Sequence, residues 1–171
     1  MQLYVERWSS PVSTLLIVTD ENGVVRALDF ADYESRMHRL LRSHYGEVAL
    51  DERKSPRAIT RALGAYFDGQ LDALDEIPTA TGGTEFQRKV WKGLRNIPAG
   101  TTISYGELAT NIGHPSASRA VGAANGQNPI AIVVPCHRVI GASGKFTGYA
   151  GGMEHKQWLL DHERKFAAVP A

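Results

Sequence analysis

One short stretch of the chain brings together residue types that can perform nucleophilic chemistry. Cys136 is the only cysteine among the 171 residues, and it stands in the sequence Pro-Cys-His-Arg directly after the apolar run 130–134. A thiolate attacks soft carbon well, and the adjacent His137 and Arg138 favour the thiolate form. A lone buried cysteine in ordinary surroundings is more often a small apolar residue. These neighbours instead favour a reactive thiol.

The apolar run before the thiol reads Ile-Ala-Ile-Val-Val and predicts a buried strand that Pro135 ends. The thiol would then lie at a strand terminus, where functional residues are often found. Successive residues of a strand point to opposite faces, so His137 is expected to meet Cys136 only through a turn or a water molecule.

The remaining composition limits the other chemistries open to this thiol. A single cysteine excludes an internal disulfide and the His/Cys/Cys zinc pattern of deaminases. The six histidines lack the spacing of metal ligands, and the signatures of papain-like and caspase-like proteases are absent. We therefore expect no metal and no cofactor.

Length, hydropathy and charge indicate a globular protein of one or two domains. No apolar stretch approaches the roughly 20 residues that span a bilayer, and the N-terminus lacks the apolar core of a secretion signal. A cytoplasmic location without membrane attachment is expected. Residues 1–79 carry 9 Lys and Arg against 13 Asp and Glu, net −4, whereas residues 80–171 carry 10 against 5, net +5. This contrast favours two domains, 1–79 and 80–171, the second facing a polyanion; a solvated basic surface is the alternative.

The first predicted domain has a small sheet with two helices. Strands are expected at residues 3–8, 13–19 and 23–30, with a hairpin turn at Asp-Glu-Asn-Gly. Apolar residues at helical spacing predict a helix over 32–45. A second helix is expected over 55–69, with Ser55 as N-cap and Pro56 in its first position. Residues 71–83, which lack periodicity, read as a linker.

The second predicted domain is rich in helices. One is expected over 84–97, and Ser104 with Glu107 forms a capping box that opens another, which Gly113 stops. A further helix starts near Pro115 or Ser116 after a four-residue turn, which gives a helix-turn-helix pattern. The last helix covers 153–163. The whole chain is therefore expected to be α+β.

The helix over 116–126 is unusual because nearly all its side chains are small. Close packing against another helix is one interpretation. Close approach to DNA is the other: the helix lacks the long polar side chains that read the major groove, and it suits the minor groove, about 6 Å wide, where readout is degenerate. Binding with little sequence specificity is expected. The residues expected to contact DNA are Ser116, Ala117, Ser118, Arg119, Ala120, Gly122, Ala123 and Asn125. Arg119 is long enough to stack in place of a base, with a surface ion pair or a phosphate contact as the alternatives.

Several blocks of residues 80–163 together resemble the O6-alkylguanine-DNA alkyltransferases, also called methylated-DNA–protein-cysteine methyltransferases. They are GTEFQRKVWKGLRNIPAGTTISYGELA, SRAVGAANGQNPIAIVVPCHRVIG, GYAGG and KQWLLDHE, in the family's order and spacing. The resemblance implies a variable, RNase H-like N-terminal domain, followed by a helical domain that carries a helix-turn-helix and an active-site loop.

The resemblance also implies roles for particular residues. Cys136 would be the alkyl acceptor, with Glu163 orienting His137, which acts on the thiol through water. Asn128 would brace the turn before the active-site loop, and Tyr105 would help rotate the nucleotide and hydrogen-bond the flipped guanine.

Further positions match the family's alkylguanine pocket. Tyr149 and the backbones of Ala150 and Val139 would line it, and Lys156 would support the active-site loop. Arg119 would fill the vacated base stack. Without the resemblance, Lys156 and Glu163 would read as ordinary exposed charges of a helix.

The implied activity is direct repair of O6-alkylguanine, with O4-alkylthymine as a second candidate lesion. The protein is expected to be a stand-alone monomer that binds duplex DNA and has no obligate protein partner. Thiolate suits displacement at an alkyl carbon, and no second thiol could cleave the thioether, so one transfer per molecule is expected. A protein that binds alkylated lesions without transfer is the alternative, and a cysteine hydrolase is a third possibility.

Overall fold

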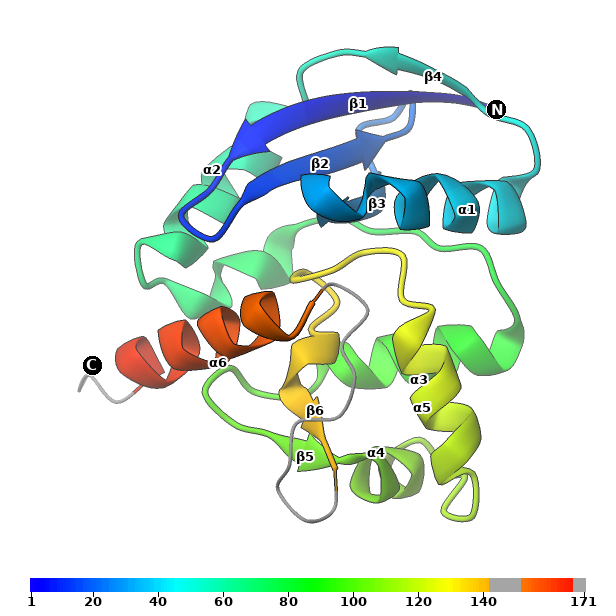
Figure 1. Ribbon diagram of the computed structural model, residues 1–171, viewed down its shortest axis with the longest axis vertical. Coiled ribbons are helices and arrows are strands. Elements are labelled where there is room, and N and C mark those ends of the chain that lie inside the picture. The colour runs from blue at the N-terminus through cyan, green and yellow to red at the C-terminus, as the bar shows by residue number, and fades with distance from the viewer. Residues whose placement is uncertain (142–151, 168–171) are drawn as a thin grey trace. The chain divides into compact units, whose positions relative to one another are not determined.

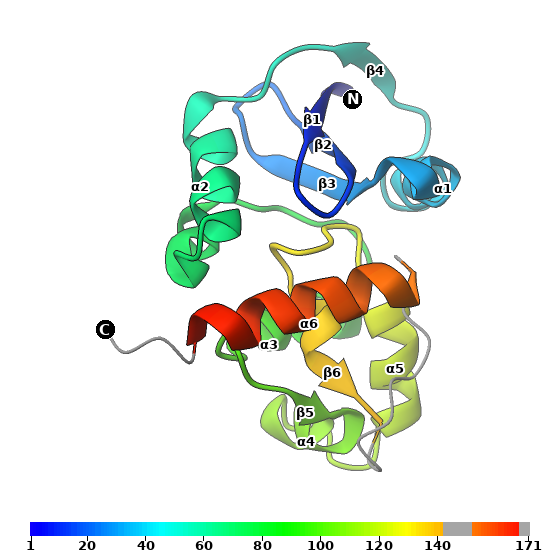
Figure 2. The same cartoon turned by 60° about the vertical axis from the view of Figure 1, so that its left-hand side comes forward.

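The computed structural model describes residues 1–141 and 152–167, and it divides the chain into two compact units (Figures 1 and 2). The first unit comprises Met1–Gly83 and Pro129–Val133, and the second comprises Thr84–Asn128 and Val134–Ala171. The α+β class predicted from the sequence is confirmed. The division falls after Gly83 rather than after residue 79, and a short segment from the second half of the sequence groups with the first unit.

Four strands form the sheet of the first unit: β1 (Gln2–Ser9), β2 (Thr14–Thr19), β3 (Val25–Phe30) and β4 (Ala49–Glu52). Their order is β3-β2-β1-β4, in which β1, β2 and β3 pair antiparallel and β4 joins β1 in parallel. The three predicted strands are confirmed. The sequence of β4, Ala-Leu-Asp-Glu, is mostly exposed and carries no alternating apolar pattern that would have indicated a strand.

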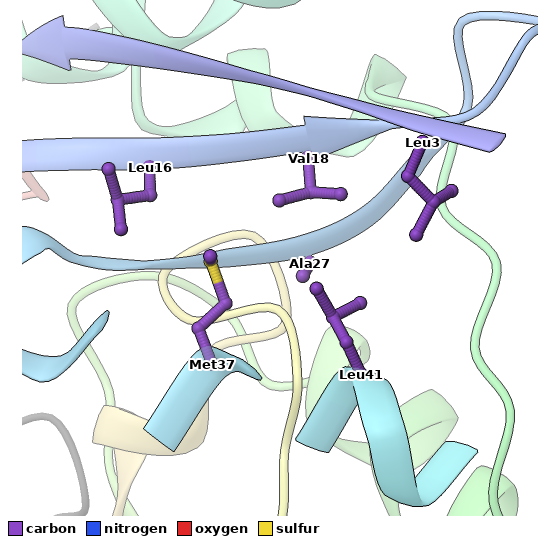
Figure 3. Packing of buried hydrophobic residues seen from close by; sticks show 6 residues of the cluster. All are labelled: Leu3, Leu16, Val18, Ala27, Met37 and Leu41. Atoms are coloured by element: carbon purple, nitrogen blue, oxygen red, sulfur yellow. The ribbon is translucent and has the colours of Figure 1, made fainter. Parts of the chain in front are cut away.

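Two helices cover the two faces of this sheet. Leu16 and Val18 of β2 pack with Met37 and Leu41 of α1 (Glu34–Tyr45), as Figure 3 shows. Each pair lies on one face of its element, since residues two apart on a strand and four apart on a helix share a face. A short 3₁₀ helix, Ala31–Tyr33, precedes α1. Trp8, which lies opposite Leu15 on the other face, contacts Phe67 of α2 (Arg57–Phe67).

The start of α2 differs from the sequence prediction. Pro56, not Ser55, occupies the N-cap position, and no side chain caps the helix. Ser55 instead donates its backbone N–H to Glu6 Oε1 at 2.8 Å, and its hydroxyl is buried. The predicted linker is also ordered: it contains a 3₁₀ helix, Leu71–Glu76, and Thr79 forms a bridge with Val25.

The apolar run before Cys136 is buried as predicted, but it is not a strand. Only Ile130 forms a bridge, with Leu28. Val133 N–H donates to the Ala131 carbonyl at 2.8 Å, which makes a γ-turn centred on Ile132, whose φ is 70°. Apolar composition alone does not distinguish a strand from another buried segment.

The described residues of the second unit form four α-helices: α3 (Glu85–Arg95), α4 (Tyr105–Asn111), α5 (Ser118–Gly126) and α6 (Met153–Ala167). Two short strands, β5 (Ile103–Ser104) and β6 (Val139–Ile140), pair in parallel. The capping box of Ser104 and Glu107 is confirmed, and a second one, Thr84 with Gln87, opens α3. None of the helices in the described ranges is long and apolar enough to cross a membrane.

The contacts of α3 fix the positions of the next two helices. Trp91 Nε1 donates to the Ala124 carbonyl of α5 at 2.9 Å. A Cβ built on Gly93 would lie 2.7 Å from Ile112 Cγ2, so α3 approaches the end of α4 at a distance that only glycine permits. The connection between α4 and α5 runs from Ile112 to Ala117, longer than the predicted four-residue turn. The helix-turn-helix assignment stays a prediction.

Candidate active site around Cys136

Cys136 opens a 3₁₀ helix, Cys136–Arg138, rather than ending a strand. Its N–H donates to the Val134 carbonyl at 2.8 Å, across a γ-turn centred on Pro135 (φ −82°, ψ 67°). Three residues per turn send successive side chains out about 120° apart, and all three are buried here. The thiol and the next two side chains therefore point in three directions from one tight turn.

His137 pairs with Glu163 of α6. The His137 Nε2 and Glu163 Oε2 atoms lie 2.8 Å apart, and both side chains are at most 1% exposed. A carboxylate only accepts, so Nε2 carries the hydrogen and Nδ1 presents a lone pair. No group of the described residues hydrogen-bonds to Nδ1. The imidazole is therefore held in the tautomer that can take up a proton at Nδ1.

Arg138 holds the same carboxylate in a fork. Its Nε donates to Glu163 Oε1 at 2.8 Å and its Nη2 to Oε2 at 2.9 Å, while Nη1 donates to the Ile97 carbonyl at 2.6 Å. The sequence suggested Arg138 only as a cationic neighbour of the thiol. Its place after Pro-Cys-His was the single signal for it, because its partner lies 25 residues further along the chain.

The electrostatics of this cluster keep Glu163 charged and His137 neutral. Burial favours the protonated acid, but His137 and Arg138 outweigh burial and hold the pKa of Glu163 below its usual range. Burial lowers the pKa of His137, with a smaller contribution from the charges of Arg138 and Lys156, against the opposing pull of Glu163. The neutral imidazole is the form needed to accept a proton.

Lys156 of α6 is fully buried and reaches the residue that ends the same turn. Its Nζ donates to the Val139 carbonyl at 2.8 Å. Burial lowers the pKa of Lys156, and negative charge on Cys136 opposes that shift. Neither Lys156 nor Glu163 is the exposed helix charge that the alternative interpretation required.

Asn128 lies where the chain leaves the second unit and Val134 where it returns. The Asn128 side chain is buried, and its Nδ2 donates to the Val134 carbonyl at 2.8 Å. This hydrogen bond closes the five-residue loop Pro129–Val133 directly before the turn that carries Cys136.

The residues expected to contact DNA divide by exposure. Arg119 is exposed and forms no ion pair with any described residue. The exposed set is Ser116, Arg119, Ala120 and Ala123, and the half-buried set is Ala117, Ser118 and Gly122. Asn125 differs from both sets, because its side chain is buried and its Nδ2 donates to the Cys136 carbonyl at 3.5 Å. Buried in this way, Asn125 is not placed to contact DNA.

The remaining residues expected at the site are Tyr105 and the residues of the alkylguanine pocket. Tyr105 begins α4, half-buried, and a Cβ on Gly122 would lie 3.8 Å from its ring, so this ring packs on α5. Val139 is buried at the start of β6. Tyr149 and Ala150 lie outside the described residues. Among the described residues, no group of three or more His, Cys, Asp or Glu side chains could hold a metal ion.

The thiol lies on a helical unit and is backed by a buried His–Glu–Arg cluster, an arrangement that suits the class of thiol-dependent transferases. Residues 85–165 match the family model described as 6-O-methylguanine DNA methyltransferase, DNA binding domain. The methylated-DNA–protein-cysteine methyltransferase of Shigella flexneri is 49% identical over 165 residues, covering 95% of this chain and 96% of that protein. The chain belongs to the methylated-DNA–protein-cysteine methyltransferase family.

Solved structures agree with this assignment. The crystal structure of Mycobacterium tuberculosis O6-methylguanine methyltransferase superposes with a TM-score of 0.80 at 40% identity, covering 99% of this chain and 96% of that one. A crystal structure of Mycobacterium tuberculosis OGT in complex with DNA gives a TM-score of 0.77 at 40% identity, covering 100% and 96%.

Proposed function

We propose that this protein repairs DNA directly, by irreversible transfer of the alkyl group of O6-alkylguanine to Cys136. The observation that carries the proposal is the buried cluster in which Glu163 fixes His137 beside the only thiol. The protein is a methylated-DNA–[protein]-cysteine S-methyltransferase, in agreement with the names of its relatives. Duplex DNA is its partner, and a DNA complex of a relative supports this.

The transfer forms one bond and breaks one. His137 takes the thiol proton at Nδ1, through a water molecule, and Glu163 stabilises the resulting imidazolium. The thiolate sulfur of Cys136 attacks the alkyl carbon, the bond from that carbon to guanine O6 breaks, and the electron pair stays on the base. The Tyr105 hydroxyl supplies a proton to the departing guanine, and the proton held by His137 then returns through water to restore the Tyr105 hydroxyl, so that neither side chain keeps a net charge. The products are unmodified guanine and a thioether on the protein.

The target carbon lies on the base-pairing edge, so the nucleotide must leave the duplex first. Extruding a base costs a few kcal/mol, and less when alkylation has weakened its pairing. In this proposal α5 lies in the minor groove, and Arg119 fills the vacated stack. The same chemistry extends to O4-alkylthymine, whose alkyl carbon is also bound to an exocyclic oxygen of the base.

The chain cannot cleave the thioether and regenerate the thiol, because Cys136 is its only thiol. Each molecule is therefore used once, and it acts in the cytoplasm, where thiols stay reduced. The repair is stoichiometric.

Intact-mass measurement after incubation with a duplex carrying one O6-methylguanine tests the proposal. We expect the protein to gain the mass of a methyl group in place of a hydrogen, on the peptide that contains Cys136, and never more than one equivalent. Cys136→Ser should show no gain. An unchanged wild-type mass would support the alternative of a lesion-binding protein, and continued turnover after the first equivalent would support a hydrolase.

A further inference from the structure

The exposed and buried residues of α5 lie on opposite faces. With 3.6 residues per turn, the outward side carries Arg119, Ala120 and Ala123, and the inward side carries Val121, Ala124 and Asn125. Asn125 is the only polar side chain of the inward side. Its exposed fraction is 6%, and the backbone carbonyl of Cys136 is its hydrogen-bond partner. One side chain thus joins the helix assigned to DNA with the residue assigned to chemistry.

Packing alone does not account for an amide at this position. A buried amide is less favourable than an apolar side chain of similar size unless its hydrogen bonds are made. Here the amide donates to Cys136 O, and no described residue donates to its Oδ1. Leucine would fill a similar volume without these polar atoms. The property that asparagine has and leucine lacks is therefore the hydrogen bond to the Cys136 backbone.

The surroundings of Asn125 make this link stiff on the helix side. The preceding carbonyl, Ala124 O, accepts from Trp91 Nε1 at 2.9 Å, and Asn128 N donates to the Asn125 carbonyl at 3.3 Å. The link itself, at 3.5 Å, is long for an N–H···O hydrogen bond. Long hydrogen bonds at a reactive site in the free protein commonly shorten once substrate is bound. A small displacement of α5 would therefore act directly on the carbonyl of Cys136.

We propose that Asn125 is a positioning residue that couples the docking of α5 on duplex DNA to the orientation of Cys136. When α5 seats on the duplex, the Asn125 amide draws the Cys136 carbonyl toward the helix and orients the thiol that projects from the same residue. This inference rests on the proposed function. It predicts that Asn125 matters for alkyl groups presented in a duplex and not for the free alkylated base, which never engages α5.

The test compares single-turnover transfer rates from two substrates: a duplex with one O6-methylguanine, and free O6-methylguanine base with a labelled methyl group. For Asn125→Leu and Asn125→Ala we expect the duplex rate to fall about tenfold, the scale of one lost hydrogen bond. The free-base rate should change less than about twofold. Leucine fills the site and alanine empties it, so a loss shared by both variants belongs to the amide. Alanine keeps the test available if the leucine variant does not fold.

Gln127→Leu is the matched control, because it removes an amide from an exposed side chain at the end of the same helix. It should leave both rates unchanged. Affinity for undamaged duplex should also stay within about twofold in the Asn125 variants, unlike that of a DNA-contacting residue.

Equal losses of rate on the two substrates would overturn the coupling and leave Asn125 a purely structural role. No loss of rate on either substrate would also overturn the coupling. A wild-type protein that transfers no methyl group at all would instead reject the proposed function.

Discussion

Glu163 accepts hydrogen bonds from two neighbouring side chains of one 3₁₀ turn. Arg138 donates hydrogen bonds to both carboxylate oxygens, and His137 donates to one of the same two oxygens. The guanidinium keeps the carboxylate ionised despite its burial, and the carboxylate fixes the imidazole tautomer. Glu163 therefore determines which nitrogen of His137 can accept a proton, although Glu163 itself does not receive the proton of the thiol.

Substitution of Arg138 tests this dependence. Arg138→Met should lower the transfer rate by at least about tenfold, because Glu163 then loses the charge that keeps it ionised. It should also destabilise the protein by about 3–5 kcal/mol, the usual cost of removing one partner of a buried ion pair. Single-turnover rates and urea unfolding measure the two effects. Arg138→Lys, a point charge without the fork, should recover only part of the rate. A lysine variant as fast as the wild type would contradict the role of the fork.

The pH dependence of transfer follows from His137. Its pKa lies below the ordinary value of about 6.5, so the imidazole stays neutral down to that pH. We expect the rate to show no loss attributable to His137 between pH 8 and 6.5, and to fall as His137 becomes protonated below. The depressed pKa also means that the unfolded state binds more protons below about pH 6.5, so this contribution to stability is present above that pH and lost as pH falls. Stopped-flow transfer and thermal unfolding across pH 5–8 measure both.

His137→Gln is the control for this pH dependence. It should transfer slowly at every pH and should unfold with a weaker dependence between pH 5 and 7. An unaltered dependence of stability in this variant would assign the effect to another group, such as His44, whose pKa burial also lowers.

The chemistry of single residues was only partly open to prediction from the sequence. The types of Cys136 and His137 suggested a reactive thiol by themselves, whereas Glu163, Asn128 and Lys156 were assigned by family resemblance. The fork of Arg138 and the inward turn of Asn125 were missed. Both depend on which side of a turn or helix faces the core, and nothing in their immediate sequence fixes that.

Among the elements, tight helix contacts explain where glycine is required. Gly93 of α3 and Gly64 of α2 both lie inside helices, where alanine is favoured by up to about 1 kcal/mol. A Cβ at Gly93 would meet Ile112 Cγ2 at 2.7 Å and Leu108 Cδ1 at 3.2 Å, while a Cβ at Gly64 would meet nothing within 4 Å. The two positions are therefore a matched pair.

We expect Gly93→Ala to destabilise the protein by about 1–3 kcal/mol through overpacking. Gly64→Ala should stabilise it by about 0.5–1 kcal/mol. Thermal or urea unfolding of both variants checks the signs. Stabilisation by Gly93→Ala would mean that α3 and α4 separate at little cost.

Local signals predicted the elements well where they were strong. The capping box at Ser104 and the three strands before residue 30 are confirmed. The strand predicted over 130–134 is wrong, because Ile132 adopts a positive φ that β-branched residues rarely occupy. Propensity would favour an extended backbone there. Contacts with Leu28, about a hundred residues earlier in the sequence, hold the segment instead.

At the scale of the whole molecule, the two units do not correspond to two continuous stretches of sequence. Pro129–Val133 belongs with the first unit, and the chain on both sides of it belongs with the second. Ile130 and Ile132 are fully buried there. A fragment that begins at Thr84 would keep these apolar side chains and lose the backbone of Leu28 that anchors them.

We therefore expect the fragment 84–171 to self-associate at concentrations where the full chain does not. Size-exclusion chromatography with light scattering compares the two. The double substitution Ile130→Ser and Ile132→Ser in the fragment should reduce this association. A monomeric fragment with unmodified isoleucines would show that the segment finds cover within the second unit.

The shielding of Cys136, of which only 6% is exposed, has a consequence for the protein before it meets any lesion. A protein that reacts only once must keep its thiol unmodified until it binds an alkylated base. Thiols are oxidised by peroxide and capped by soluble electrophiles in proportion to their accessibility. Under the proposed single-use reaction, the burial of this sulfur determines how long each molecule stays active. It therefore also determines the fraction of the protein in a cell that can still react when DNA damage occurs.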